Sequence, residues 1–233
     1  MNGKGILITS VVLIILYIII RGLFLKSKLT GISDAKLTQT ITADSMVSTE
    51  SNTSNFTYSI WLYIDNWNYK YGEPKIVLGR MDTEKDPQFG IVLAPMQNDL
   101  NINIETYPSS DNSSTSSHTC NVQNIPLQKW VHCLVSVYGK SMDVYIDGKL
   151  VRTCILPGVA KINNDTDLSI TPLGGFSGLT SNFQFIPNAT NPQEAYNIYK
   201  KGYGGSALGN LFNKYRIKFV FLVDNKDQGS FEI

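Results

Sequence analysis

Apolar residues follow two different patterns along this chain of 233 residues, and the first is a continuous run near the N-terminus. Residues 6–20 are apolar except for two hydroxyl residues, and the apolar character resumes after Arg21. A helix rises about 1.5 Å per residue, so this stretch is long enough to cross a hydrocarbon core. No small-residue cleavage site follows it, as a signal peptide would require. The pattern predicts a retained transmembrane anchor at residues 1–28.

The charges beside this run predict its orientation, although a second signal opposes them. Only Lys4 precedes the run, whereas several basic residues follow it, which favours a C-terminal domain on the cytosolic side. N-x-S/T sequons point the other way, because their use would require display on the opposite side. Sequons also arise by chance in a chain rich in Asn, Ser and Thr, so we expect the cytosolic side. The sequons are at Asn52, Asn55, Asn112, Asn164 and Asn188.

Period-two alternation is the second pattern, and it begins after a polar segment. Residues 29–55 are rich in Ser and Thr and predict a stalk that contributes at most a first strand. From residue 56 onward, short alternating segments are separated by turn residues, which is typical of a sandwich or jelly roll. Along residues 56–64, one face carries only large apolar side chains: Phe56, Tyr58, Ile60, Leu62 and Ile64.

A three-stranded meander over residues 130–154 is the strongest local prediction. Two of its strands flank Asp147 and Gly148, a pair that favours a two-residue hairpin turn because both positions need positive φ. The segment 109–118 is of low complexity and predicts an exposed loop. Further strands are expected at residues 75–79, 89–94, 100–106, 168–170 and 179–186, and a short helix at residues 192–202.

The three cysteines predict at most one disulfide. Cys133 alternates with valines on one face, so it should be buried, and it lies two strands from Cys154, too far for a bridge. If a disulfide exists, we expect it between Cys120 and Cys154. No CxxC spacing is present and the chain has only two histidines, so no metal site is predicted.

Charge excludes a further class of partner. The formal net charge is +1, only 17% of residues are charged, and basic and acidic residues are mixed along the chain. Nucleic-acid-binding domains instead gather Lys and Arg on one face. We therefore expect no nucleic-acid partner.

Three segments in order resemble the concanavalin A-like, laminin-G-type family. They are FTYSIWLYI at residues 56–64, LQKWVHCLVSVYGKSMDVYIDGKLV at 127–151 and GGFSGLTSNFQFIP at 174–187, followed by the helix QEAYNIYKKG. The resemblance implies an all-β, concanavalin A-like jelly-roll sandwich over residues 56–202, preceded by one N-terminal transmembrane helix. Residues 203–233 then form a C-terminal tail strand.

A narrower resemblance rests on the predicted anchor together with the segments CNVQNIPLQKW and LVRTCILPGV. In these features the chain is similar to membrane-associated virion proteins of nucleocytoplasmic large DNA viruses. It implies a single-pass virion structural protein, a minor capsid protein that links an internal membrane to the capsid through protein-protein contacts. Its partners would be the lipid bilayer and other virion proteins, with the domain on the capsid-facing, cytosol-derived side.

A membrane-displayed, lectin-like attachment module that binds glycans is the alternative. Trp67, Tyr69 and Tyr71 in the segment DNWNYKYGE are its candidate binding residues, because exposed rings stack on sugars or partner proteins. The competing interpretation is that this loop folds its rings back over the edge of the sandwich. Used sequons would favour the displayed lectin.

Catalysis is not expected, and neither is a cofactor. Glycoside hydrolases need two carboxylates at a fixed separation, and their strand motif resembles E-x-D-x-x-E. The nearest string begins at Glu84, lacks the last acid and carries Pro87. Asp82, Glu84 and Asp86 alternate as calcium-loop acids do, but Pro87 stands where such a loop needs Gly, so we expect a solvated loop.

The tail has an apolar face that must be covered, because open apolar edges invite aggregation. It either folds back beside residues 37–47 or adds to a partner's sheet, and we favour folding back. This face carries Tyr215, Ile217, Phe219, Phe221 and Val223.

Overall fold

The computed structural model describes seven stretches of the chain, and these fall into two compact units. The described residues are 30–46, 55–81, 87–107, 115–162, 165–204, 218–223 and 226–232. One unit is a sandwich within Leu29–Tyr203, and the other includes a C-terminal hairpin. None of the helices in these stretches is long and apolar enough to cross a membrane. The anchor predicted at residues 1–28 lies outside them.

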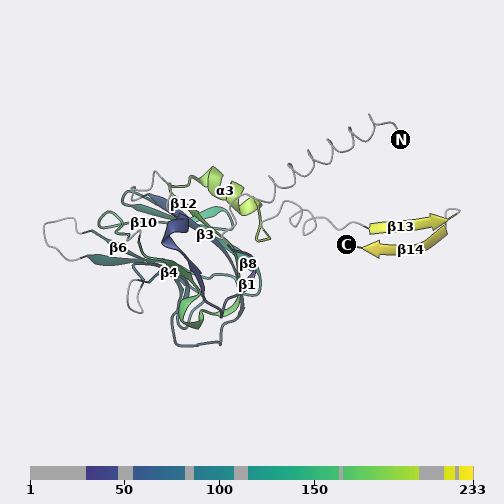
Figure 1. Cartoon of the computed structure of the whole chain (residues 1–233), viewed down its shortest axis with the longest axis horizontal. Helices are drawn as coiled ribbons and strands as arrows, with labels where there is room; N and C mark the ends of the chain where they lie inside the picture. The colour runs from purple at the N-terminus through teal and green to yellow at the C-terminus, as the bar shows by residue number, and fades with distance from the viewer. Residues whose placement is uncertain are drawn as a thin grey trace. The chain divides into compact units, whose positions relative to one another are not determined.

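Two antiparallel six-stranded sheets face each other in the sandwich (Figure 1). Sheet A has the order β1 (Ser33–Asp34), β12 (Ser177–Ile186), β3 (Phe56–Asn66), β8 (Trp130–Tyr138), β9 (Ser141–Ile146) and β10 (Lys149–Ile155). Sheet B has the order β2 (Gln39–Ile41), β11 (Leu168–Ile170), β4 (Lys75–Arg80), β5 (Phe89–Leu93), β6 (Leu100–Thr106) and β7 (Ser116–Val122). The all-β sandwich predicted from the sequence is confirmed.

The core between the sheets is built on the alternation of β3. All five large apolar residues predicted for its inner face are buried. The ring of Tyr58 lies 4.8 Å from that of Phe89 on sheet B, and its hydroxyl accepts a 2.9 Å hydrogen bond from Arg80 Nε. Burial raises the pKa of Tyr58, and the Arg80 charge opposes that shift. Arg80 is itself buried and also donates to the Thr166 carbonyl at 3.3 Å. The two sheets are therefore joined by a polar contact as well as by apolar packing.

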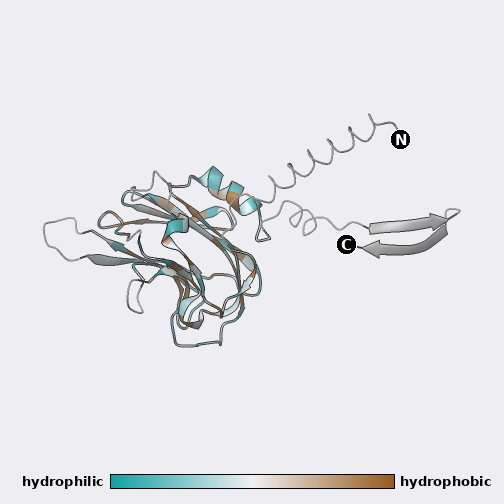
Figure 2. Cartoon of the chain, viewed as in Figure 1, coloured by the Kyte–Doolittle hydropathy of each residue, from teal (hydrophilic) through white to brown (hydrophobic). Residues whose placement is uncertain are grey.

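Helix α3 (Pro192–Lys200) covers the outer face of sheet A, so the central strands are buried on both faces. The side chain of Asn191 accepts from the backbone N–H of Glu194, and Glu194 reaches back to the Asn191 N–H, which forms a capping box. Ala195 and Ile198 pack on a small cluster with Leu134 and Tyr145. Hydrophobic residues of α3 are separated from its hydrophilic ones in Figure 2.

His132 lies in an aromatic cluster on this covered face. Its ring centroid is 5.0 Å from that of Trp61 and 6.0 Å from that of Tyr199. Nε2 shares a 2.8 Å hydrogen bond with Ser59 Oγ, whereas Nδ1 has no hydrogen-bond partner among the described residues. Burial lowers the pKa of His132 from 6.5 to about 3, so the imidazole is neutral near pH 7.

The predicted meander and its hairpin turn are confirmed. β8 pairs with β9 and β9 with β10, and Asp147 and Gly148 have φ of 50° and 74°. The Asp147 carboxylate also accepts a 2.9 Å hydrogen bond from the backbone N–H of His132. The turn is therefore fixed both by its backbone and by its side chain.

Two boundaries expected from the sequence are wrong. Residues 30–46, assigned to a polar stalk, contribute β1 to sheet A and β2 to sheet B, and helix α2 (Ala43–Met46) follows them. These strands were not predicted, because two or three residues are too few to show an alternation of apolar and polar side chains. β7 also begins at Ser116, inside the segment predicted as a loop, because pairing with β6 outweighs the low strand propensity of Ser.

The C-terminal unit contains a two-stranded antiparallel hairpin of β13 (Lys218–Val223) and β14 (Lys226–Glu232). The sequence predicted a single tail strand that either packs beside residues 37–47 or joins a partner's sheet. Within the described residues the tail has two strands rather than one, because β13 pairs with β14, the segment that follows it in the chain. Packing beside residues 37–47 or joining a partner's sheet stays a prediction.

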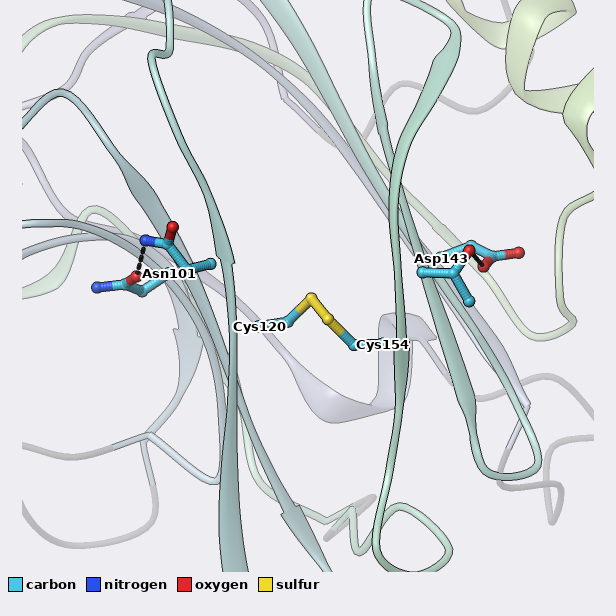
Figure 3. The surroundings of a disulfide bond; sticks show 6 residues. Asn101, Cys120, Asp143 and Cys154 are labelled. Atoms are coloured by element: carbon cyan, nitrogen blue, oxygen red, sulfur yellow. Dashed lines mark hydrogen bonds between the residues drawn. A yellow bond between two sulfur atoms is a disulfide. The ribbon is translucent and has the colours of Figure 1, made fainter.

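A disulfide joins the sheets at one side of the sandwich (Figure 3). Cys120 on β7 and Cys154 on β10 have Cα atoms 6.1 Å apart, within the range for a bridge. β7 and β10 are the edge strands of sheets B and A. Cys133 is free and buried, and burial raises the pKa of its thiol to about 12, so it remains protonated. The bond therefore ties two strands that no backbone ladder connects.

Loss of this disulfide should lower the free energy of unfolding by about 4 kcal/mol, the chain-entropy value for a loop of this size. We expect this for Cys120→Ser combined with Cys154→Ser, measured by urea titration with tryptophan fluorescence in detergent. Cys133→Ala is the matched control, because it keeps the bridge and should still be destabilised by reductant. Equal stability of the wild type with and without reductant would contradict the role assigned to the bond.

His132 should make the sandwich sensitive to acid. Between pH about 3 and 6.5 the unfolded chain binds a proton that the folded state rejects, so stability falls as the pH decreases. The loss is about 1.4 kcal/mol per pH unit below 6.5. Urea titrations at pH 7, 6, 5 and 4 should show a shallower dependence in His132→Gln, because carboxylate effects are common to both proteins. Parallel curves for the two proteins would rule out this contribution.

Candidate binding site where three turns meet

Three connections of the sandwich meet at one corner, and their side chains form a candidate binding site. They are the β1–β2 turn at residues 35–38, the β3–β4 connection at residues 67–74, and residues 171–176 around the 3-10 helix η1 (Pro172–Gly174). The exposed or half-buried side chains used below are Lys36, Tyr69, Lys70, Tyr71 and Leu173, and we name this set the Tyr69 corner.

Reciprocal hydrogen bonds hold the β1–β2 turn against η1. Thr171 Oγ1 donates to the carbonyl of Leu37 at 2.8 Å, and Thr38 Oγ1 donates to the carbonyl of Thr171 at 3.0 Å. The backbone N–H of Phe176 donates to the carbonyl of Ala35 at 3.2 Å. The two connections are therefore docked through backbone positions, although they lie far apart in sequence.

The β3–β4 connection attaches to the same place through side chains. The Tyr69 hydroxyl donates a 2.9 Å hydrogen bond to the carbonyl of Gly174, and Lys70 Nζ donates to the carbonyl of Leu173. A Cβ at Gly174 would lie 3.1 Å from Lys70 Nζ and 3.3 Å from the Tyr69 hydroxyl. Glycine at this position therefore permits the close approach of both side chains.

Backbone strain is concentrated at this corner. Lys70, Thr171 and Leu173 have φ of 49°, 51° and 56°, and they are three of the seven non-glycine residues with positive φ in the described part of the chain. For a β-branched residue such as Thr171 this conformation is unusual. Strained residues cost on the order of 1–3 kcal/mol each and cluster at ligand sites, where the surrounding structure holds them in place. The strain is therefore a reason to look for function here.

The corner is also positively charged. The ammonium groups of Lys36 and Lys70 lie 5.1 and 5.8 Å from the centroid of the Tyr69 ring. Neither ammonium forms an ion pair with any described residue. The nearby Asp34 carboxylate accepts a 2.9 Å hydrogen bond from the backbone N–H of Lys36. Two cations therefore lie within 6 Å of one ring centroid, and no described carboxylate pairs with either of them.

The three aromatic residues predicted from the sequence to bind a ligand, Trp67, Tyr69 and Tyr71, have different environments. Trp67 packs against the core, and the ammonium of Lys75, a residue only 2% exposed, lies 4.5 Å from its ring centroid. Burial lowers the pKa of Lys75, and the Glu73 carboxylate opposes this shift. Tyr69 is half-buried and hydrogen-bonded, whereas Tyr71 is 59% exposed. The structure thus leaves Tyr71 as the outward-facing ring of the three.

Sequence reasoning missed the cationic part of the corner. Lys70 stands between two predicted aromatic residues, so its position was a usable signal. Lys36 and Leu173 come from other connections, and no local pattern links them to Tyr69.

The outer face of sheet B carries polar side chains that bond to one another. Asn121 Nδ2 donates to Asn101 Oδ1 at 2.8 Å, and Thr119 Oγ1 donates to the Asn103 side chain at 2.9 Å. Figure 3 shows the Asn101 contact beside the disulfide. These side chains form a neutral surface whose hydrogen bonds are already made within the sheet.

The carboxylates flanking this polar face are too far apart to act as a pair. Asp99 and Glu105 are six residues apart along β6 and its approach, which corresponds to about 20 Å at ~3.3 Å per residue. Glycosidase carboxylates lie about 5–9.5 Å apart. Within the described stretches, no group of three or more His, Cys, Asp or Glu side chains is placed to hold a metal ion. The acidic segment at residues 82–86 lies outside those stretches.

A second surface lies at the disulfide edge. A hollow of about 320 Å³ is lined by residues 121–126 together with Ile146, Val151 and Arg152. The edge strand β10 beside it exposes Leu150, Val151 and Ile155. This edge combines exposed apolar side chains with polar ones, because Lys149 and Arg152 are also exposed on β10.

Comparison with known proteins agrees with the architecture. The binding domain of botulinum neurotoxin DC in complex with rat synaptotagmin II has a TM-score of 0.50 at 13% identity, over 67% of this chain and 40% of that one. The same domain in complex with SialylT has a TM-score of 0.49 at 15% identity, over 63% and 35%. This chain therefore matches less than half of each of these structures. No curated protein sequence matches it.

Comparison with family models identifies the superfamily. The profile described as the Concanavalin A-like lectin/glucanases superfamily matches residues 35–195, which include every strand of the sandwich except β1. The match begins within the turn that joins β1 to β2 and ends inside α3. The chain belongs to the concanavalin A-like lectin/glucanases superfamily.

Proposed function

We propose that this chain is a membrane-anchored, non-catalytic recognition protein whose sandwich binds saccharides at the Tyr69 corner. The observation that carries the proposal is the Tyr69 ring, which has two ammonium groups within 6 Å of its centroid that pair with no described carboxylate, in the connection that also exposes Tyr71. Aromatic rings supply stacking area for sugars at a low cost in side-chain entropy. The hydrogen-bonded and strained backbone of the corner supports a preformed site.

Several features support binding rather than catalysis. The carboxylates on the outer face of sheet B are too far apart to act together, and Cys133 and His132 are both buried with pKa values that keep them neutral. A buried thiol with a raised pKa is a poor nucleophile. These four residues therefore support recognition rather than catalysis.

The disulfide bears on the side of the membrane at which the domain works. Disulfides persist in oxidising compartments and are rare in the cytosol. The Cys120–Cys154 bond therefore supports display on the non-cytosolic side, against the charges beside the predicted anchor. Display on that side is what a glycan-binding attachment module requires.

A second candidate function rests on the disulfide edge. Leu150, Val151 and Ile155 are 48%, 48% and 71% exposed on β10, an edge strand with one unpaired side. Such an edge is suited to contact with another protein. It favours the role of a virion structural protein that links an internal membrane to capsid proteins. Replacing Leu150 and Ile155 by Ser would then block assembly into particles without changing saccharide binding.

Saccharide binding should depend on Tyr71. We expect Tyr71→Ala to weaken binding about tenfold, since an aromatic contact contributes about 0.5–1.5 kcal/mol beyond its buried area. Binding of the full chain in detergent would be screened on an oligosaccharide array and quantified by calorimetry. Tyr138→Ala is the matched control, because this tyrosine is 68% exposed at the end of β8, away from the corner. Equal losses in both variants would show that the corner is not the site.

Glycosylation at Asn188 should report the orientation. Asn188 is exposed and begins the sequon Asn188-Ala189-Thr190. If the domain is displayed, a chain made in a secretory host should lose one glycan mass in the Asn188→Gln variant, as measured by intact-mass spectrometry. A wild-type domain without any glycan would instead support the cytosol-derived side and the structural role.

A further inference from the structure

The two lysines of the Tyr69 corner indicate the class of ligand more specifically than its aromatic rings do. A neutral sugar needs stacking area and hydrogen bonds but no charge. Cation–π attraction to the Tyr69 ring holds both ammonium groups here and does not neutralise them. Within the described residues both lack an ion-pair partner. Cations held near each other without counter-charge repel one another, so they favour an anion between or beside them.

The two lysines are held differently, which separates their roles. Lys70 is fixed, because its left-handed backbone and its hydrogen bond to the Leu173 carbonyl set the direction of the side chain. It keeps two further N–H donors, since an ammonium has three. Lys36 lies on an exposed turn, and its ammonium makes no hydrogen bond to a described residue. The pair therefore offers one preorganised cation and one that can move toward a ligand.

The distances limit the size of the anion. Both ammonium nitrogens lie within 6 Å of the same ring centroid, so they are at most about 11 Å apart. A single acidic sugar residue fits within that span, with its ring against an aromatic face and its charged group toward a lysine. Lysine is a flexible point charge that does not impose the planar, two-bond geometry of arginine, so it accepts a carboxylate or a sulfate.

Two carboxylates lie near the lysines of this corner and offset their charge only in part. Asp34 accepts a hydrogen bond from the backbone N–H of Lys36, and Glu73 lies near Lys75, so two acids stand against three lysines. Lys75 begins β4, and its ammonium is buried without a hydrogen-bond partner in the described structure. A third cation at the end of the same connection thus adds to the positive potential of the corner.

We propose that the ligand of the Tyr69 corner is an acidic saccharide, whose carboxylate or sulfate group is bound by Lys36 and Lys70. This inference rests on the proposed saccharide-binding function and names the class of its ligand.

The test compares acidic and neutral forms of one sugar. Binding of the full chain in detergent to sialyllactose, sulfated lactose and lactose is measured by calorimetry in 0.1 M salt. We expect at least one acidic form to bind about tenfold more tightly than lactose. The preference should shrink to about twofold in 1 M salt, because the Debye length falls from about 10 Å to 3 Å.

Three variants assign the effect to the corner. Lys36→Gln should lose most of the preference for the acidic sugar and keep the affinity for lactose, and Lys36→Arg should retain the preference. Lys140→Gln is the matched control, because Lys140 is exposed on the β8–β9 turn and its loss changes the net charge equally. Melting curves check that the variants fold.

Each outcome tests a different part of the proposal: the acidic ligand, the site or the saccharide-binding function. Equal affinity for acidic and neutral sugars, with binding still dependent on Tyr71, would overturn the acidic ligand and leave the saccharide function standing. A preference that falls equally in Lys36→Gln and Lys140→Gln would show an effect of net charge and overturn the site, and a preference that survives Lys36→Gln would overturn the role of Lys36. If no saccharide binds, the proposed function fails, and this inference fails with it.

Discussion

The contact between Tyr58 and Arg80 is the interaction on which the rest of the sandwich depends. The Tyr58 ring packs across the core on Phe89, and its hydroxyl accepts a hydrogen bond from the Arg80 guanidinium. A buried cation is tolerated only when its donors are bonded, so the contact specifies which residues of the two sheets face each other. A slip of β3 by one residue would bring Thr57 or Ser59 to this place and turn the apolar face outward. The register of β3 then fixes β8 and β12 on its two sides.

The sequence predicted the parts of the fold in which one physical signal dominates. The alternation of β3 and the positive-φ turn at Asp147 and Gly148 are local, and the structure has both. β1 and β2 have only two and three residues, and their pairing depends on longer neighbours, although β11, which is equally short, was predicted at residues 168–170. Burial of the outer face of sheet A also could not be read from β3 alone, because α3 supplies the cover. Trp61 and His132 are therefore buried although they lie on the face opposite the main core.

The candidate site, like the fold, was predicted from the sequence only in part. Its aromatic residues lie in one short segment and were found as a cluster, but the sequence could not say that Trp67 turns toward the core while Tyr71 faces outward. The sequence predicted Cys120 and Cys154 as the pair if any disulfide existed, and the structure contains that bond. The cations could not be grouped in advance, because Lys36 and Lys70 meet only after β1 pairs with β12 and η1 forms. The corner is thus a product of chain topology rather than of a motif.

The disulfide at one side of the sandwich makes local opening of the two sheets unequal at their two sides. β7 and β10 cannot separate while the disulfide is intact, whereas the opposite edges are β1 and β2, which have two and three residues. Short edge strands have the fewest backbone hydrogen bonds to lose, so fraying and amide exchange begin there. The Tyr69 corner includes the turn that joins those two strands. A ligand bound there would clamp the side that the disulfide leaves free, and the sandwich would then be closed at both edges.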